Sequence, residues 1–313
     1  MDDWRPNIRF VPWPGALPRA GKLGRIVLVD IAFAFGERFD TVTKPFIDAA
    51  GRNLAMWIDH HPHPGWSSFL NDERFVLVDK RLAPACPQLV TPDRVVALEA
   101  DGVDTVLAHG DFDGCLSAVK LALRGEEPYD GADEDARAVD APGRGFSLSE
   151  RGDRMACAFA HASHAESMSD YVELLGRSAQ SLIDGEAPGR ESGGLAELLD
   201  RYADQERALI ASVLPRLADA YSPHPSLVVL ELVTPVARSV KKALLQQLEE
   251  RALVAMIDED GFVTAASFHD LNTPLNSLPG LNGGESYAWG NVELADVVEA
   301  WIRSADGSRP KSV

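Results

Sequence analysis

The feature that most constrains the fold is a strand, a turn and a helix within residues 103–123. The apolar run over residues 103–108 is typical of a buried strand, and the small and apolar residues 114–123 predict a helix. The turn between them reads His-x-Asp-x-Asp-Gly, which places an imidazole and two carboxylates just beyond the strand. Open α/β sheets hold their functional sites at the carboxyl ends of their strands. The segment therefore predicts an α/β fold with a polar site at that edge.

This turn also has a plainer interpretation. Asp111 and Asp113 could cap the following helix through its free N–H groups, with His109 merely polar. Two further clusters favour metal ligation. Asp30 ends one strand-like run, and the tripeptide Asp-His-His at residues 59–61 follows another. Three strands that each deliver Asp or His at the same end indicate a polynuclear metal site.

Together these motifs resemble the DHH phosphoesterase superfamily. Residues 59–61 resemble its naming motif, residues 109–114 its His-x-Asp-x-Asp motif, and Asp30 its lone carboxylate. In that family the His-x-Asp-x-Asp motif normally precedes the other two, whereas here it comes last. The simplest account is circular permutation, to which sheet geometry is indifferent provided that the termini lie close together.

The resemblance implies a site for two divalent metal ions. Its implied ligands are His109 and Asp111 for one ion, Asp113 and His60 for the other, and Asp30 as a bridge between them. Asp and His ligands without a thiolate suit Mn²⁺ or Mg²⁺ before Zn²⁺, and we expect Mn²⁺ first. One further ligand is open. Asp79, which ends the apolar run 75–78, is a candidate, and Asp140 is a weaker rival.

Two residues beside the metals have implied roles in phosphoester hydrolysis. His61 would hydrogen-bond the scissile phosphate or protonate the leaving group, and Asp59 would orient a neighbouring His. Two ions about 4 Å apart clamp a phosphoryl group and activate a shared water. We therefore expect a metal-dependent phosphodiesterase or phosphatase acting on a short oligonucleotide, a cyclic dinucleotide or a nucleoside 3′,5′-bisphosphate. An inorganic pyrophosphatase and a nucleotide-binding homologue without turnover are the alternatives.

The C-terminal part predicts a second α/β domain. A Gly-Gly pair at residues 283–284 precedes a helix expected over 292–302, and such a pair lets backbone N–H groups approach an anion closely. It resembles the Gly-Gly-His motif of the DHHA1 domain that follows many DHH domains, so Gly283 and Gly284 would contact substrate. His269 would be a further substrate contact where the family usually has Arg, and Glu285 stands in place of the motif's His.

The expected organisation has three parts. Residues 1–183 form a DHH-like domain whose mostly parallel sheet carries helices on both faces, residues 184–225 are a linker with a bridging helix, and residues 226–313 form a smaller DHHA1-like domain. Within the first part, the proline-rich residues 1–24 predict an extended arm, and the acidic, glycine-rich residues 126–154 predict a solvated surface loop.

Composition limits the partners. The chain has 48 acidic and 30 basic residues and a formal net charge of −18, which argues against binding a long duplex nucleic acid. Three cysteines without CxxC spacing favour a reduced, cytoplasmic protein. Residues 1–5 lack a signal-peptide pattern, and no apolar run approaches the roughly 20 residues that span a bilayer. We expect a small nucleotide or short single-stranded substrate and no membrane, with a homodimer left open.

Overall fold

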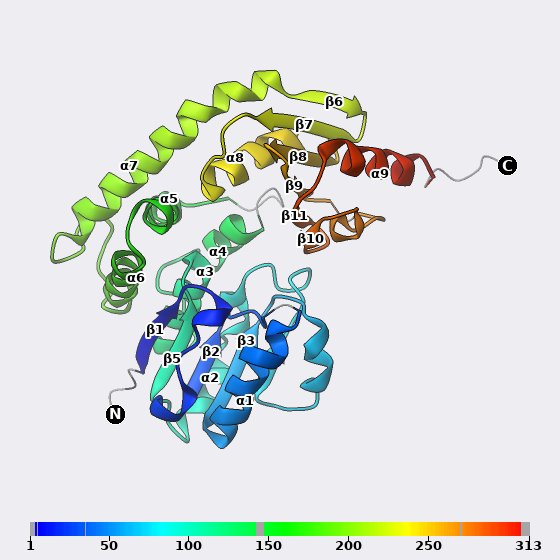
Figure 1. Ribbon diagram of the computed structural model, residues 1–313. Helices are drawn as coiled ribbons and strands as arrows, with labels where there is room; N and C mark the ends of the chain where they lie inside the picture. Colours follow the sequence, from blue (N-terminus) through cyan, green and yellow to red (C-terminus); the bar gives the residue numbers. More distant parts are fainter. Residues whose placement is uncertain (1–3, 5, 35, 142–146, 270, 308–313) are drawn as a thin grey trace. The chain divides into compact units, whose positions relative to one another are not determined.

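The computed structural model describes residues 4, 6–34, 36–141, 147–269 and 271–307 (Figure 1). The chain divides into two compact units. The boundary between them falls between Gln205 and Glu206, inside the long helix α7 (Leu195–Val213). The expected division, with a linker over residues 184–225, stays a prediction. Across the described ranges, no helix is both long enough and apolar enough to cross a membrane.

The first unit is built on a five-stranded sheet. Its strands are β1 (Asn7–Val11), β2 (Ile26–Val29), β3 (Leu54–Asp59), β4 (Phe75–Leu77) and β5 (Thr105–His109). Their order in the sheet is β1-β5-β2-β3-β4, and every neighbouring pair is parallel. Such sheets are buried on both faces, and all four residues of β2 are buried. The predicted parallel α/β sheet is confirmed.

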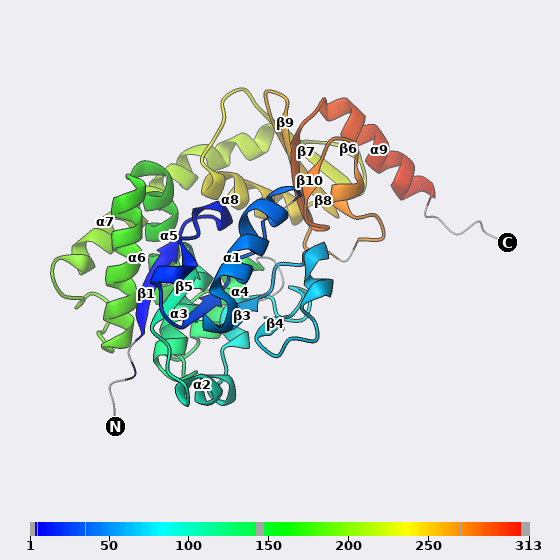
Figure 2. The ribbon, with the colours of Figure 1, turned by 60° about the horizontal axis from the view of Figure 1, so that its bottom comes forward.

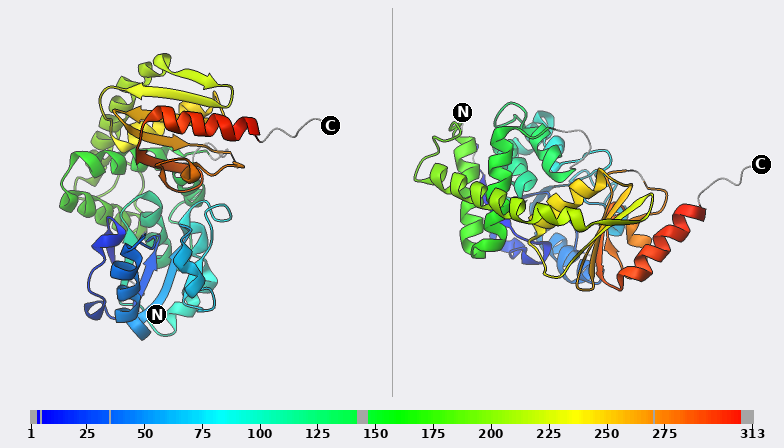
Figure 3. Two further views of the ribbon diagram at one scale, coloured as in Figure 1. Left: turned by 45° about the vertical axis from the view of Figure 1, so that its right-hand side comes forward. Right: turned by 90° about the horizontal axis from the view of Figure 1, so that it is seen from above.

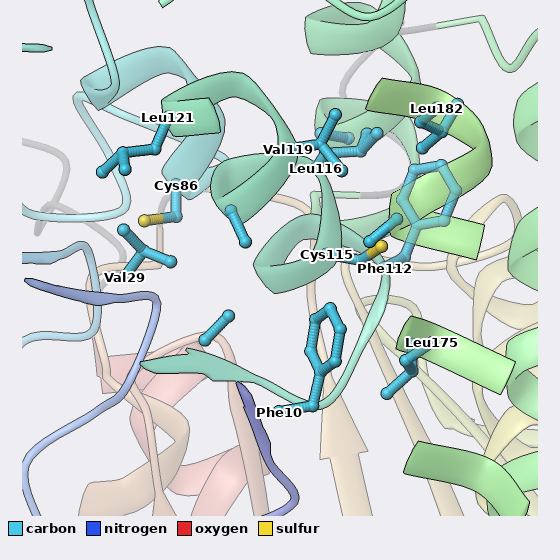
Figure 4. Close-up of a cluster of buried hydrophobic side chains, with 14 of the residues drawn as sticks. Phe10, Val29, Cys86, Phe112, Cys115, Leu116, Val119, Leu121, Leu175 and Leu182 are labelled. Atoms are coloured by element: carbon cyan, nitrogen blue, oxygen red, sulfur yellow. The ribbon is translucent and has the colours of Figure 1, made fainter. Parts of the chain in front are cut away.

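Helices cover both faces of this sheet (Figure 2). They are α1 (Lys44–Ala50), α2 (Pro92–Glu99), α3 (Phe112–Ala122), α4 (Ala132–Asp140), α5 (Glu150–Ala165) and α6 (Met168–Ile183). On one face, Phe46 of α1 belongs to an apolar cluster with Trp57 of β3. On the other, α3 and α6 pack together, and Figure 4 shows Leu116 of α3 and Leu175 of α6 in this second cluster. Apolar packing on both faces therefore holds the strands, and with them the carboxyl edge of the sheet, in place.

The second unit holds a mixed six-stranded sheet between two helices (Figure 3). Its elements are β6 (Tyr221–His224), β7 (Leu227–Leu232), α8 (Arg238–Glu249), β8 (Val254–Glu259), β9 (Phe262–Ala266), β10 (Asn282–Gly283), β11 (Tyr287–Asn291) and α9 (Leu294–Gly307). Only β7 and β8 pair in parallel among the described strands of this sheet. Leu244 of α8 packs on one face and Trp301 of α9 on the other. The predicted second α/β unit is confirmed.

Two expectations for the first unit are wrong. Within the proline-rich arm, Asn7–Val11 form β1, because the free edge of β5 offers backbone partners in register with all five residues. Within the expected surface loop, residues 132–140 form α4, whose Asp135 is buried and accepts hydrogen bonds from Tyr129 and Ser149. Residues 142–146 of that stretch lie outside the described residues.

One buried ion pair ties α5 to the chain that follows α6. The Arg154 guanidinium donates to Glu191 and Asp200, each at 2.5 Å, and to the carbonyl oxygen of Ala196 at 2.9 Å. Glu191 is buried. The guanidinium therefore balances a carboxylate that water does not reach.

We expect Arg154→Ala to lower the free energy of unfolding of the first unit by about 3–5 kcal/mol, because it leaves the Glu191 carboxylate buried without its cation. Urea unfolding followed by circular dichroism measures this change. Arg52→Ala, which removes an exposed arginine from the same unit, is the matched control. Equal stability of the two variants would contradict the role given to Arg154.

Candidate metal centre

Strand pairing brings the predicted ligands to one edge of the first sheet. Val29 of β2 is in register with Ile58 of β3 and with Ala108 of β5. The residues that follow these positions are Asp30, the Asp-His-His tripeptide and His109. Parallel neighbours end at the same edge, so these side chains emerge side by side.

Asp30 lies at the centre of the cluster. Its carboxylate oxygens are 3.2 Å from His60 Nε2, 3.7 Å from His61 Nδ1 and 3.6 Å from His109 Nδ1. The side chain is fully buried, and neither oxygen meets hydrogen-bond geometry with a described donor. Burial alone would raise the pKa of Asp30, but the imidazoles of His109, His60 and His61 hold it well below its ordinary value. The carboxylate is thus kept ionised and available to a cation.

The backbone at Asp30 is strained. Its φ of +61° lies in the left-handed region, which Asp and Asn tolerate better than most other residues. The Asp30 N–H donates to the carbonyl oxygen of Ile58 at 2.9 Å and so anchors the turn to β3. Strain of this kind persists where the surrounding structure imposes it, which is common at functional sites.

His60 is oriented as a metal ligand would be. Its Nδ1 lies 2.9 Å from the carbonyl oxygen of Ala83, and because a carbonyl only accepts, Nδ1 carries the proton. Nε2 then faces Asp30, with Asp113 at 3.5 Å and Asp140 at 3.4 Å. Burial would lower the pKa of His60, yet the Asp30 carboxylate outweighs it and the pKa is raised. The surroundings of Nε2 therefore favour a positive charge.

The two carboxylate oxygens of Asp111 contact different groups. One of its oxygens accepts a hydrogen bond from the Gly114 N–H at 3.1 Å and caps α3, while the other lies 2.8 Å from His109 Nδ1. A Cβ at Gly114 would lie 2.4 Å from the His109 carbonyl oxygen, so this tight turn needs glycine. Capping and proximity to His109 thus occur together at one carboxylate.

Asp113 lies in the first turn of α3 and is buried. It accepts a hydrogen bond from the Cys86 N–H at 3.3 Å. Burial, followed by the nearby charges of Asp30, Asp140 and Asp111, raises the pKa of Asp113 well above its ordinary value. The crowded carboxylates repel one another, and a bound cation would relieve that repulsion.

Of the two candidates for the remaining ligand, the structure brings Asp140 to the cluster. Asp140 ends α4 and lies beside His60 and Asp113. The carboxylate of Asp79 instead forms an ion pair with Arg81 at 3.0 Å. Lys80, which the sequence analysis did not single out, forms an ion pair with Asp140. Nothing in the local pattern around Lys80 marks it, because its partner lies 60 residues on, at the end of α4.

The Asp-His-His tripeptide also contains a positioned pair. Asp59 is fully buried, and its Oδ1 accepts a hydrogen bond from His61 Nδ1 at 2.9 Å. The His61 side chain keeps 31% of its surface exposed. Asp59 therefore orients a histidine that solvent, and hence a ligand, can reach.

The predicted substrate contacts lie in the second unit. Gly283 has a φ of +113°, and a Cβ there would lie 2.6 Å from the Trp289 ring, so the hairpin itself requires glycine. Gly284 donates to the Tyr287 carbonyl oxygen at 2.8 Å. The His269 N–H donates to Ser267 Oγ at 3.1 Å. The substrate-binding role of Gly283, Gly284 and His269 stays a prediction.

Three groups of potential ligands result, each with its ligand atoms within 4.8 Å of one another. They are Asp30–His60–His61, Asp30–His109–Asp111 and His60–Asp113–Asp140. Several buried atoms in these groups have no hydrogen-bond partner among the described residues, including both Asp30 oxygens and His60 Nε2. These groups contain the ligands that the resemblance to the DHH phosphoesterases implies. Their oxygen and imidazole donors fit Mn²⁺ or Mg²⁺.

Comparison with solved structures finds similar folds at low sequence identity. An exonuclease RecJ bound to manganese is 14% identical, with a TM-score of 0.48 over 93% of this chain and 78% of that chain. RecJ from Thermus thermophilus with Mn²⁺ is 16% identical, with a TM-score of 0.47 over 92% of this chain and 46% of that one. This chain thus matches about half the length of the Thermus protein.

The pGpG-specific phosphodiesterase PggH from Vibrio cholerae is 12% identical, with a TM-score of 0.44 over 80% of this chain and 79% of that one. No protein-family model and no curated protein matches the sequence. These are likenesses of fold, and the chemistry of the site rests on its own side chains.

We expect Mn²⁺ to raise the melting temperature of the wild-type protein and of Asp79→Asn but not of Asp30→Asn. Asparagine tolerates the left-handed backbone at position 30 but removes the charge at the centre of the cluster. At a hundredfold excess of ion over the dissociation constant, binding stabilises the folded state by about 2.7 kcal/mol. Thermal unfolding with and without the ion measures the effect. A full Mn²⁺ response in Asp30→Asn would exclude this carboxylate as a ligand.

Proposed function

We propose that the chain is a DHH-type phosphoesterase that hydrolyses a small nucleotide substrate with two divalent metal ions. The observation that carries this proposal is the convergence of Asp30, His60, His109, Asp111 and Asp113 on one sheet edge. Mn²⁺ is the first choice of ion because the donors are carboxylate and imidazole without thiolate.

The ligand groups suggest how two ions would be held. Asp30, His109 and Asp111 form one group, and His60, Asp113 and Asp140 form another. Asp30 also lies 3.2 Å from His60, so it is placed to bridge the two groups. This division supports the assignment implied by the resemblance and adds Asp140 in place of Asp79. When bound, two such metal ions would activate water and stabilise the charge that develops on a phosphoryl group.

His61 is the proposed catalytic residue supplied by the chain. Asp59 accepts a hydrogen bond from the Nδ1–H of His61, which fixes the orientation of the ring. The partial exposure of the ring leaves it accessible to a phosphoryl group. From there His61 would hydrogen-bond the phosphate or protonate the leaving oxygen.

A small substrate suits the charge of the chain. With a net charge of −18, a broad basic surface for duplex nucleic acid is not to be expected, whereas bound cations would reverse the field locally at the ligand cluster. Short single-stranded oligonucleotides, dinucleotides and nucleoside bisphosphates are the proposed substrates. Gly283, Gly284 and His269 remain proposed substrate contacts.

The sheet supports circular permutation relative to the family's motif order. β5, which carries the His-x-Asp-x-Asp motif, is the last strand of its sheet along the chain but lies between β1 and β2. A chain that began with β5 would carry that motif before Asp30 and the Asp-His-His tripeptide, as in the family's order, while each strand kept its neighbours in the sheet. We propose that the same site is built here with the chain opened at another loop.

We expect purified protein with Mn²⁺ to hydrolyse at least one member of a panel comprising a short RNA, a short DNA, pGpG, cyclic di-AMP and a nucleoside 3′,5′-bisphosphate. Asp113→Asn should lose at least about a thousandfold in rate, because it removes a ligand from ions that stabilise the transition state by several kcal/mol. Asp79→Asn is the matched control and should retain activity. Turnover of inorganic pyrophosphate alone would favour a pyrophosphatase, and bound Mn²⁺ without turnover of any substrate would contradict the proposal.

A second variant separates catalysis from metal binding. We expect His61→Asn to lower kcat by roughly 10²–10⁴-fold, the contribution typical of a positioned acid or base. Its affinity for Mn²⁺ should stay close to that of the wild type. Steady-state kinetics and calorimetric titration of the same preparation test both expectations. A loss of Mn²⁺ affinity in step with the loss of activity would make His61 a ligand instead.

A further inference from the structure

Lys80 brings a permanent positive charge into the ligand cluster. It follows β4, and its ammonium forms an ion pair with Asp140 Oδ2. The same oxygen lies 3.4 Å from His60 Nε2 and belongs to the His60–Asp113–Asp140 group. An ammonium has three donors and no lone pair, so it cannot itself ligate a metal. It occupies an oxygen that an ion at this group would use.

The Asp30–His109–Asp111 group has no such ammonium among the described residues. Within the described part of the chain, Asp30, His109 and Asp111 form ion pairs only with one another and with the two histidines of the tripeptide. An ion entering there therefore displaces no ammonium. Of these two groups, only His60–Asp113–Asp140 forms an ion pair with an ammonium among the described residues.

We propose that Lys80 makes the two ions unequal, by competing for Asp140 with the ion at the His60–Asp113–Asp140 group. This inference rests on the metal centre proposed above. To bind there, the ion must move the ammonium off Asp140 or share the oxygen with it at the cost of like-charge repulsion. The Lys80 side chain is one-third exposed and flexible, so the ammonium can turn into solvent when it is displaced.

This arrangement would give one tightly held and one exchangeable ion. The tight ion binds at Asp30, His109 and Asp111. The exchangeable ion binds only at higher ion concentration, or when a substrate phosphate adds its own oxygens as ligands. Lys80 thereby sets the concentration of divalent ion at which the two-ion site is complete.

Calorimetric titration of the whole metal-free protein with Mn²⁺ tests the proposal. We expect two classes of site in the wild type, and we expect Lys80→Met to tighten the weaker class roughly tenfold or more while the stronger class changes little. Arg81→Met is the matched control, because it removes a neighbouring positive charge that pairs with Asp79 instead. It should leave both classes unchanged. Lys80→Gln is a second variant, and the melting temperature of each metal-free variant verifies folding.

A double variant shows whether the effect runs through Asp140. In an Asp140→Asn background, Lys80→Met should no longer tighten the weaker class, since the competing contact is already gone. The proposal is overturned if Lys80→Met leaves both classes unchanged, if Arg81→Met acts equally, or if the tightening persists without Asp140. These results would leave the metal centre intact. Absence of any Mn²⁺ binding by the wild type would instead overturn the metal centre, and this inference with it.

Discussion

The site depends on a concentration of negative charge that the chain balances only in part. Asp30 and Asp113 are buried, and burial together with neighbouring carboxylates raises the pKa of Asp113. The imidazoles of His60 and His109 and the ammonium of Lys80 offset some of this charge. Buried carboxylates without sufficient partners destabilise a fold, so a divalent cation here would act on stability as well as on catalysis. Metal binding and folding of this edge are therefore expected to be coupled.

Adjacency in the sheet, rather than order in the chain, assembles the ligands. β2 lies between β3 and β5, so the residue after β2 faces motifs that lie about 30 residues downstream on one side and about 80 on the other. The strained turn at Asp30 sits at this central position and is held by a hydrogen bond to Ile58. Any chain connection that keeps β2 between the other two strands keeps the site. This is why an altered motif order is compatible with an intact ligand cluster.

The convergence of the proposed ligands could be predicted from the sequence because each motif directly follows an apolar run. Strand ends and their polar residues are local features, and parallel pairing brings them together. Asp140 and Lys80 could not be placed in the same way, because their pairing depends on how α4 packs. The residues of α4 are mostly acidic and small, which locally resembles a solvated loop. The helix joins the fold by burying Ala132 and Ala136 in the apolar cluster and Asp135 against Tyr129 and Ser149. β1 was missed for a similar reason, since its partner β5 lies about 100 residues away.

Capping and metal ligation are not competing explanations of the His-x-Asp-x-Asp turn. The first N–H groups of α3 need an acceptor, and one oxygen of Asp111 satisfies the N–H of Gly114. A carboxylate has a second oxygen, and at Asp111 that oxygen faces His109. The cap fixes the side chain at the low entropic cost of a local contact, so the second oxygen is already in place for a cation. The plainer interpretation of the motif thus describes how the same residue is prepared for the proposed metal centre.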